Sequence, residues 1–252
     1  MTPQSLPFPA PPVVTDTELG RLGAGDVNLV WVPAPALYGG GVAQNTNRRA
    51  TNDRIVWIDC EMTGLNLTTD ALIEVAALVT DYELNQLGDG IDLVIKPPAA
   101  ALEQMDDFVR DMHTSSGLLE ELDAGITMAE AEKQVLAYVR EWAPDTGKAP
   151  LGGNTVGTDR GFLARDMPEL ESHLHYRIID VSSIKELALR WFPRAFFASP
   201  KKAGGHRALA DIRESIAELR YYREAIFVAP PGPDTETARA IAARHKVVPT
   251  VS

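Results

Sequence analysis

The sequence predicts an α/β fold in which one mixed five-stranded sheet is flanked by helices in a single domain. Two observations lead to this fold class. Three apolar segments rich in β-branched residues follow one another between residues 55 and 95. Farther along the chain, short strand-like segments alternate with segments of helical periodicity. Antiparallel strands followed by β-α-β units are typical of a mixed sheet with helices on its faces. The chain has 252 residues, 45% of them apolar, which is enough for a sizeable core.

The first three strands are expected at residues 55–60, 72–81 and 91–95. The second and third read as a hairpin, with a turn near 85–90, where two glycines fall. A short fourth strand is expected around Leu151 and a fifth at 177–180. Glu74 is an acid inside the apolar second strand, and we interpret it as structural.

Helices are expected where apolar residues recur with a period near 3.6. The segment 129–142 shows this period through Ala131, Val135 and Val139, which reads as a core-facing stripe. Further helices are expected at 159–165, 182–191, 207–225 and 235–245.

The two ends of the chain differ from its centre, the domain 53–228. Residues 1–52 form a Pro- and Gly-rich extension, which we expect to be mobile. Residues 229–252 read as a tail with one short helix, for which Asp234 is a plausible N-cap. No apolar run approaches a membrane span, and no secretory signal is visible. The single cysteine, Cys60, excludes an intrachain disulfide and fits a cytoplasmic location.

The formal net charge of −11 argues against a protein that tracks long nucleic acids. Such proteins usually carry a basic surface, because phosphate contacts supply most of their non-specific affinity. A nucleic-acid substrate of this chain is therefore expected to be short. A local basic patch is still possible beside His206, made of Arg194, Lys201, Lys202 and Arg207.

Asp59 and Glu61 lie at the end of the first predicted strand. Residues two apart on a strand project from the same face, so the two carboxylates are expected side by side and Cys60 is expected to face the core. Neighbouring carboxylates repel each other unless a cation shares them, and hard divalent ions prefer oxygen ligands. Alone, such a pair is more often an acidic strand end exposed to solvent.

Two further segments change that interpretation. Asp159 follows a Gly-rich turn at 152–157 and opens a helical stretch, and His206 lies five residues before Asp211. On one regular helix, residues at that spacing would lie about 140° apart. We therefore expect His206 at the helix entrance or on the preceding loop at 204–205. The helical period alone would turn Asp211 toward solvent, away from Leu209 and Ile212.

Taken in order, these segments resemble the DEDD 3′→5′ exonucleases, in the subclass with a histidine in the last motif. Residues 57–64, 112–114, 153–154 and 206–216 look specifically like the oligoribonuclease family, and the resemblance spans 54–227. It implies a ribonuclease-H-like fold and hydrolysis of very short RNA, down to dinucleotides, to 5′-mononucleotides. It also implies two divalent cations, Mg²⁺ or Mn²⁺, and a catalytic set in which His206 is the general base and the metal ligands are Asp59, Glu61, Asp159 and Asp211.

The resemblance further implies substrate-binding residues. Leu65 matches a leucine that wedges against a base, and Phe108 stands where the family usually carries a tryptophan. His113 matches a histidine that contacts the substrate phosphate, and Asn154 belongs to the motif around Asp159. The family also forms a homodimer, in which the segment containing His175, Tyr176 and Arg177 reaches the neighbouring protomer's site.

Two alternatives stay open at this point. A DEDD exonuclease acting on longer substrates, of the RNA-trimming or DNA-proofreading type, would favour a basic groove or added nucleic-acid modules. A non-catalytic, nucleotide-binding dimeric protein would favour loss of an acid or of the histidine, whereas all five positions are filled.

Overall fold

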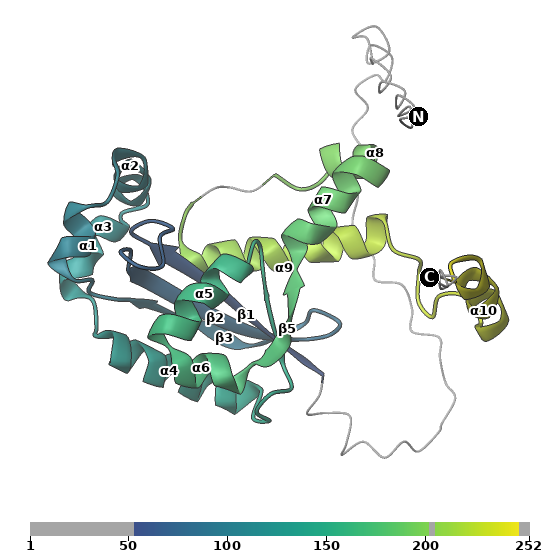
Figure 1. The fold of residues 1–252 in the computed structure, drawn as a ribbon, viewed down its shortest axis with the longest axis horizontal. Coiled ribbons are helices and arrows are strands. Elements are labelled where there is room, and N and C mark those ends of the chain that lie inside the picture. Colours follow the sequence, from purple (N-terminus) through teal and green to yellow (C-terminus); the bar gives the residue numbers. More distant parts are fainter. Residues whose placement is uncertain (1–52, 202–204, 247–252) are drawn as a thin grey trace, which may run out of the picture. The chain divides into compact units, whose positions relative to one another are not determined.

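A computed structural model describes residues 53–201 and 205–246. The expected N-terminal extension, 1–52, lies outside these described residues. The described part contains a five-stranded sheet with the strand order β3-β2-β1-β4-β5 (Figure 1). Its strands are β1 (Arg54–Met62), β2 (Leu72–Asp81), β3 (Gln86–Val94), β4 (Pro150–Gly153) and β5 (His175–Asp180).

The sheet is mixed, which confirms the predicted fold class. β2 pairs antiparallel with both β1 and β3. β4 pairs in parallel with both β1 and β5. Along the β1–β2 pair, Asp59 lies opposite Ala76 and Glu61 lies opposite Glu74. β5 ends the sheet, so one of its sides has no neighbouring strand among the described residues.

Helices cover both faces of the sheet (Figure 1). On one face, Val56, Ile58 and Cys60 pack in a core with α4 (Met128–Trp142), α5 (Gly157–Asp166) and α6 (Pro168–His173). On the other face, Ile55 and Trp57 pack with α7 (Val181–Trp191) and α9 (Ala208–Ala225). Cys60 is therefore buried in the core, as its place between two acids predicted. The alternation along β1 leaves Asp59 and Glu61 on the α9 face.

Several short helices were not predicted from the sequence. Between β3 and α4 the chain forms α1 (Ala99–Glu103), α2 (Asp107–Ser115), α3 (Leu118–Glu121) and a 3₁₀ turn, η1 (Leu122–Ala124). Leu118 and Leu122 pack against Ile73 of β2 and hold this helical segment on the sheet. Its helices are too short to show a long apolar period, which is why periodicity missed them. α8 (Pro193–Phe197) is equally short.

The predicted turn at 85–90 is wrong. The chain turns at residues 82–85 instead, where Leu84 has a φ of 66° and the side chain of Asp81 accepts a hydrogen bond from Asn85 N (2.8 Å). Gly88 and Gly90 belong to β3. They are needed for close approach, since a Cβ at Gly88 would lie 2.6 Å from the Trp142 indole nitrogen.

In the tail, α10 (Thr235–Arg244) begins as predicted, because the Asp234 side chain accepts a hydrogen bond from Thr237 N. Across the described ranges, no helix combines the length and apolar character that a membrane crossing needs.

Candidate active site

Three acids from two elements converge at the end of β1. Asp59 and Glu61 of β1 and Asp211 of α9 each offer a carboxylate oxygen, and these oxygens all lie within 4.8 Å of one another. We call these three residues the acid cluster. It confirms that the two strand acids share a face, and that Asp211 turns toward them.

α9 is held so that Asp211 reaches β1. Ala208, Ile212 and Ile216 are buried against the sheet, and Asp211 lies in the first turn, beside this stripe. The negative charge of an acid near a helix N-terminus is favoured by the unpaired backbone N–H groups there. The first turn of α9 is therefore a favourable place for an acidic side chain such as that of Asp211.

Asp159 lies beside the acid cluster but is bonded differently. It is buried in the first turn of α5, and its Oδ1 accepts a hydrogen bond from Cys60 N at 3.0 Å. The peptide unit between the two strand acids is thus tied to the fourth acid. A carboxylate has a second oxygen, so this bond does not prevent Asp159 from serving as a ligand.

The negative charges of these neighbouring acids repel one another. Burial raises the pKa of Glu61 to about 8, helped by the charges of Glu74, Asp211 and Asp159 and opposed by Arg207. Burial also raises the pKa of Asp159 to about 6, although backbone N–H donors oppose that rise. An all-oxygen, mutually repelling donor set suits a hard divalent cation, which would hold all the carboxylates in their ionised form.

His206 lies just before α9, at the expected helix entrance. It is exposed, and its backbone is in the left-handed region with a φ of 47°. Its role as general base stays a prediction.

Leu65 and Phe108 come together beside the acid cluster. Their side chains are 76% and 78% exposed, which is unusual for large apolar groups. Both line a pocket of about 240 Å³ that also contains Glu61, with Val109 and Met112 of α2 on its wall. An apolar notch next to an acid cluster is a suitable place for a flat aromatic base.

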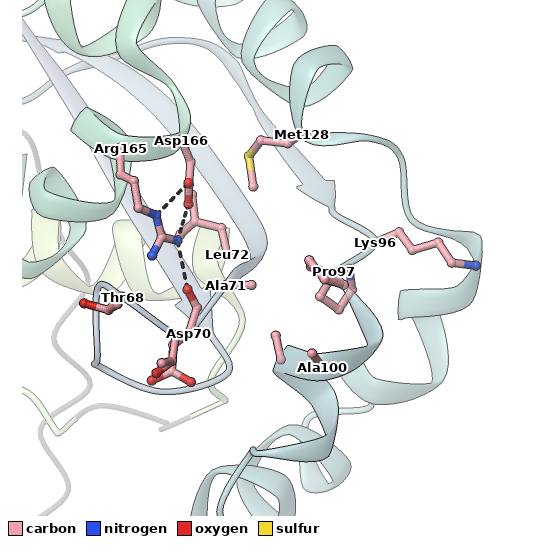
Figure 2. Close-up of a pocket in the computed structure, with 13 residues that line it drawn as sticks. Thr68, Asp70, Ala71, Leu72, Lys96, Pro97, Ala100, Met128, Arg165 and Asp166 are labelled. Atoms are coloured by element: carbon pink, nitrogen blue, oxygen red, sulfur yellow. Dashed lines mark hydrogen bonds and ion pairs between the residues drawn. The ribbon is translucent and has the colours of Figure 1, made fainter.

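Hydrogen bonds to Asp70 and from Arg165 hold the loop that carries Leu65. Asp70 accepts hydrogen bonds from Thr63 Oγ1 (3.0 Å) and Asn66 N (2.9 Å). Arg165 donates to the carbonyl of Asp70 while paired with Asp166 (Figure 2). It also donates to the carbonyl of Leu67. Asp70, Arg165 and Asp166 border a larger pocket of about 650 Å³, which contains none of the predicted site residues.

His113 lies beneath the acid cluster, with no exposed surface. Its Nε2 is 2.9 Å from Met62 O, whereas Nδ1 has no hydrogen-bond partner and lies 4.0 Å from Glu61 Oε2. Burial lowers its pKa. In this arrangement His113 supports the acid end of β1, and its predicted phosphate contact stays a prediction.

The side chain of Asn154 is engaged within the protein. Its Nδ2 donates to Ser215 Oγ (2.7 Å), and its Oδ1 accepts from Ser182 Oγ (3.0 Å). Asn154 thereby ties the turn before α5 to α9 and α7, and so holds Asp159 and Asp211 in register. Its predicted contact with substrate is not seen among these bonds and stays a prediction. Ser182 and Ser215 gave no sequence signal.

His175, Tyr176 and Arg177 lie on β5, outside both the acid cluster and the Leu65–Phe108 pocket. Tyr176 is exposed; His175 stacks on it at 4.4 Å, and the Arg177 guanidinium lies 5.4 Å from its ring centre. Within one chain, these residues are not brought to the acids.

The sequence left open a basic patch that would include Arg207. In the structure, Arg207 is paired with acidic residues and is not available to such a patch. Its guanidinium bonds to Glu74 and to Glu121, and Glu74 is completely buried. Lys202, another member of that patch, lies outside the described residues. The sequence signal for this ion pair was Glu74, a single acid in an apolar strand, because a buried charge requires a partner.

Comparison with known proteins agrees with this geometry. The sequence profile of a family described as exonuclease matches residues 56–219. An oligoribonuclease from Streptomyces avermitilis is 75% identical over 194 residues, covering 77% of this chain and 97% of that protein. An oligoribonuclease from Cutibacterium acnes is 64% identical over 192 residues, covering 76% of this chain and 95% of the relative.

Solved structures share the fold. An exonuclease I from Methylocaldum szegediense superposes with a TM-score of 0.50 at 20% identity, and a zinc-bound Escherichia coli exonuclease I–ssDNA complex with 0.51 at 17%. Each match covers 69% of this chain but only 41% of the exonuclease I chain. At these identities the likeness concerns the fold alone.

Proposed function

The chain belongs to the oligoribonuclease family of 3′→5′ exoribonucleases, and from that membership we propose that it hydrolyses RNA of two to a few nucleotides to 5′-mononucleotides. One observation supports a short substrate most strongly. The Leu65–Phe108 pocket has room for little more than one base and lies directly against Glu61. A substrate whose terminal base fills this pocket brings its phosphodiester to the acid cluster.

We assign the metal-binding role to Asp59, Glu61 and Asp211, with Asp159 completing the set. The donors are all carboxylates, which favours Mg²⁺ or Mn²⁺. When bound, two such ions would neutralise charge on the phosphodiester and make a nearby water more acidic.

The remaining steps fall to side chains. The imidazole of His206 takes the proton of the attacking water, because a histidine that is neutral near pH 7 is suited to this transfer. Leu65 and Phe108 hold the 3′-terminal base by apolar contact and stacking, which tolerate base identity. Asp159, through its bond to Cys60 N, keeps the peptide between Asp59 and Glu61 in place.

We further propose a homodimer. β5 is an edge strand with exposed Tyr176 and Ile178, and the neighbouring helices α7 and α8 expose Trp191 (66%) and Phe197 (79%). Clustered exposed apolar residues of this kind favour an interface. A two-fold contact would present His175, Tyr176 and Arg177 to the other protomer's site. We also propose a cytoplasmic location, which the single, buried cysteine supports.

The experiment is a competition between RNAs of increasing length. Purified protein is mixed with a dinucleotide and with longer oligomers of matched sequence, with Mg²⁺, with Mn²⁺, or with a chelator. We expect the dinucleotide to be consumed first, and only when a divalent ion is present. Preference for the longer RNA by about an order of magnitude at physiological salt would instead favour the long-substrate alternative. Hydrolysis in the chelator would exclude the metal assignment.

A further inference from the structure

We propose that Arg207 is a positioning residue, which fixes His206 at the start of α9 and ties it to α3, the helix that follows α2 with Phe108 and His113. This inference rests on the proposed role of His206 as general base. It concerns three residues that are neither metal ligands nor in the Leu65–Phe108 pocket: Arg207, Glu74 and Glu121.

The first half of the arrangement anchors α9. Glu74 Oε1 accepts a hydrogen bond from Arg207 Nε (2.8 Å), and Glu74 Oε2 accepts from Ala208 N (3.0 Å). α9 has no capping bond from its own N-cap residue, Arg207. Glu74 therefore supplies the cap from a neighbouring strand, and it lies opposite Glu61 in the β1–β2 register. The start of α9 is fixed relative to the acids.

The second half reaches α3, next to the helix that lines the Leu65–Phe108 pocket. Arg207 Nη1 and Nη2 donate to Glu121 Oε1 and Oε2 at 2.7 and 3.1 Å, a bidentate pair. Glu121 ends α3, which follows α2 with Phe108 and His113. One guanidinium thus joins β2, the start of α9 and the α2–α3 segment.

His206 is the residue that this arrangement would control. Its left-handed φ of 47° is costly for a residue with a side chain and persists only when its surroundings hold it. Its peptide bond leads directly into Arg207, whose side chain is held on two sides. Loss of that hold would let His206 relax to an ordinary conformation and move its imidazole.

The chemistry requires arginine. The fork must satisfy Glu74 through Nε and Glu121 through both terminal nitrogens at once, which a lysine ammonium cannot do. If Arg207 served only to neutralise Glu74, lysine would be an adequate replacement. This difference separates a positioning role from simple charge balance.

The main test is a double-mutant cycle measured on a dinucleotide with Mn²⁺. Arg207→Ala should lower kcat by about 10- to 100-fold, the cost of a misplaced catalytic group. Combined with His206→Ala, it should cause no further loss, since its effect passes through His206. Losses that multiply in the double variant would overturn the proposal. A near-normal kcat for His206→Ala alone would instead contradict the proposed function.

A surface variant tests the link to the pocket without removing the buried ion pair. Glu121→Ala should lower kcat about two- to fivefold, the range for an exposed pair, and raise KM for the dinucleotide. Glu120→Ala, at the neighbouring exposed acid, is the control and should behave as wild type. Equal behaviour of the two variants would contradict the link.

Arg207→Lys covers the case in which Arg207→Ala does not fold. It should keep its melting temperature close to that of wild type and its Mn²⁺ affinity by calorimetry, yet lose kcat as Glu121→Ala does or more. Full activity of Arg207→Lys would show that charge alone suffices and would overturn the proposal.

Discussion

The two halves of the sheet differ in how completely they are buried. In β2, every residue except the last is buried, and the strand lies between β1 and β3 with helices on both faces. In β5, no residue reaches full burial, and Tyr176 and Ile178 point into solvent. The acids lie in the buried half, where their backbone is held from every side. The edge half exposes the surface on which a second chain is proposed to dock.

This difference predicts where substitutions matter. A change among the acids should remove activity without unfolding the chain, because neighbouring carboxylates repel one another. A change at the edge should act only through another chain. The following predictions test that division, from the largest expected effect to the smallest.

Replacing a member of the acid cluster should have the largest effect. Asp59→Ala and Asp211→Ala should reduce dinucleotide hydrolysis to the level seen in a chelator, because a missing ligand misplaces the cation. Calorimetric titration with Mn²⁺ should show weakened binding, with the melting temperature of the metal-free protein unchanged or higher. Asp53→Ala, at an exposed acid beside β1, should retain wild-type activity. A cluster variant with normal turnover would remove that residue from the site.

His206→Ala should lower kcat by about 10²–10⁴, the range for loss of a general base. Mn²⁺ affinity should be unchanged, since His206 is not proposed as a ligand. Single-turnover rates over a pH series provide the check. The acidic limb of the wild-type profile should be absent from the variant, and its persistence would assign the proton to another group.

Phe108→Ala should raise KM for a dinucleotide with a smaller effect on kcat. One stacked base is worth about 1–3 kcal/mol, which corresponds to roughly 5- to 150-fold. Phe108→Trp should equal or exceed wild type in affinity. Phe227→Ala, at another exposed phenylalanine, is the matched control. An unchanged KM in Phe108→Ala would place the base elsewhere.

Tyr176→Ala should reduce activity although Tyr176 lies outside the acid cluster. Mixed with Asp59→Ala chains under conditions of subunit exchange, it should recover part of the activity. Each mixed dimer would then contain one site with intact acids and an intact tyrosine from the partner. Activity no higher than that of the two parents, once exchange is shown, would contradict the shared site. So would a monomer by light scattering.

The smallest effect concerns pH and stability in the metal-free protein. The pKa values of Asp159 and Glu61 are raised to about 6 and about 8, so the folded state binds protons that the unfolded state releases. This contribution to stability is complete below the unfolded pKa values and is lost as pH rises through 6 and then 8. The melting temperature in chelator should therefore fall as pH rises from about 4 to about 8. Glu61→Gln should reduce that slope, and saturating Mn²⁺ should raise stability most at high pH.

Much of the fold, and the shared face of Asp59 and Glu61, could be predicted because their signals are local, whereas the place of Asp211 in the acid cluster followed only from the family resemblance. Alternation along β1 placed Asp59 and Glu61 on one face, and the apolar stripe of α9 located the helix that carries Asp211. The helix entrance at His206 followed from its spacing to Asp211. Long periodic segments of this kind specify their own structure.

The parts that were missed depend on contacts between distant segments. Gly88 and Gly90 predicted a turn, but they lie in β3. Glycine is needed at these positions because the side chains of Trp142 and Leu209 pack closely against them. The hydrogen bonds of Asn154 to Ser215 and Ser182 also join distant segments and gave no local signal, whereas its predicted contact with substrate stays a prediction. No pattern near Arg207 indicates that its partners are 133 and 86 residues away.

The edge strand β5 also bears on how the chain avoids aggregation. Unpaired backbone groups on an edge strand can template pairing with unrelated chains. Here Arg160 donates to the carbonyls of His175 and Tyr176 (3.1 and 3.0 Å), and Arg177 N donates to the His175 ring (3.0 Å). Three backbone groups of the strand are therefore already satisfied by side chains. A newly synthesised chain is less able to extend its sheet into a neighbour, and the proposed dimer would depend on side-chain surfaces that only a second copy complements.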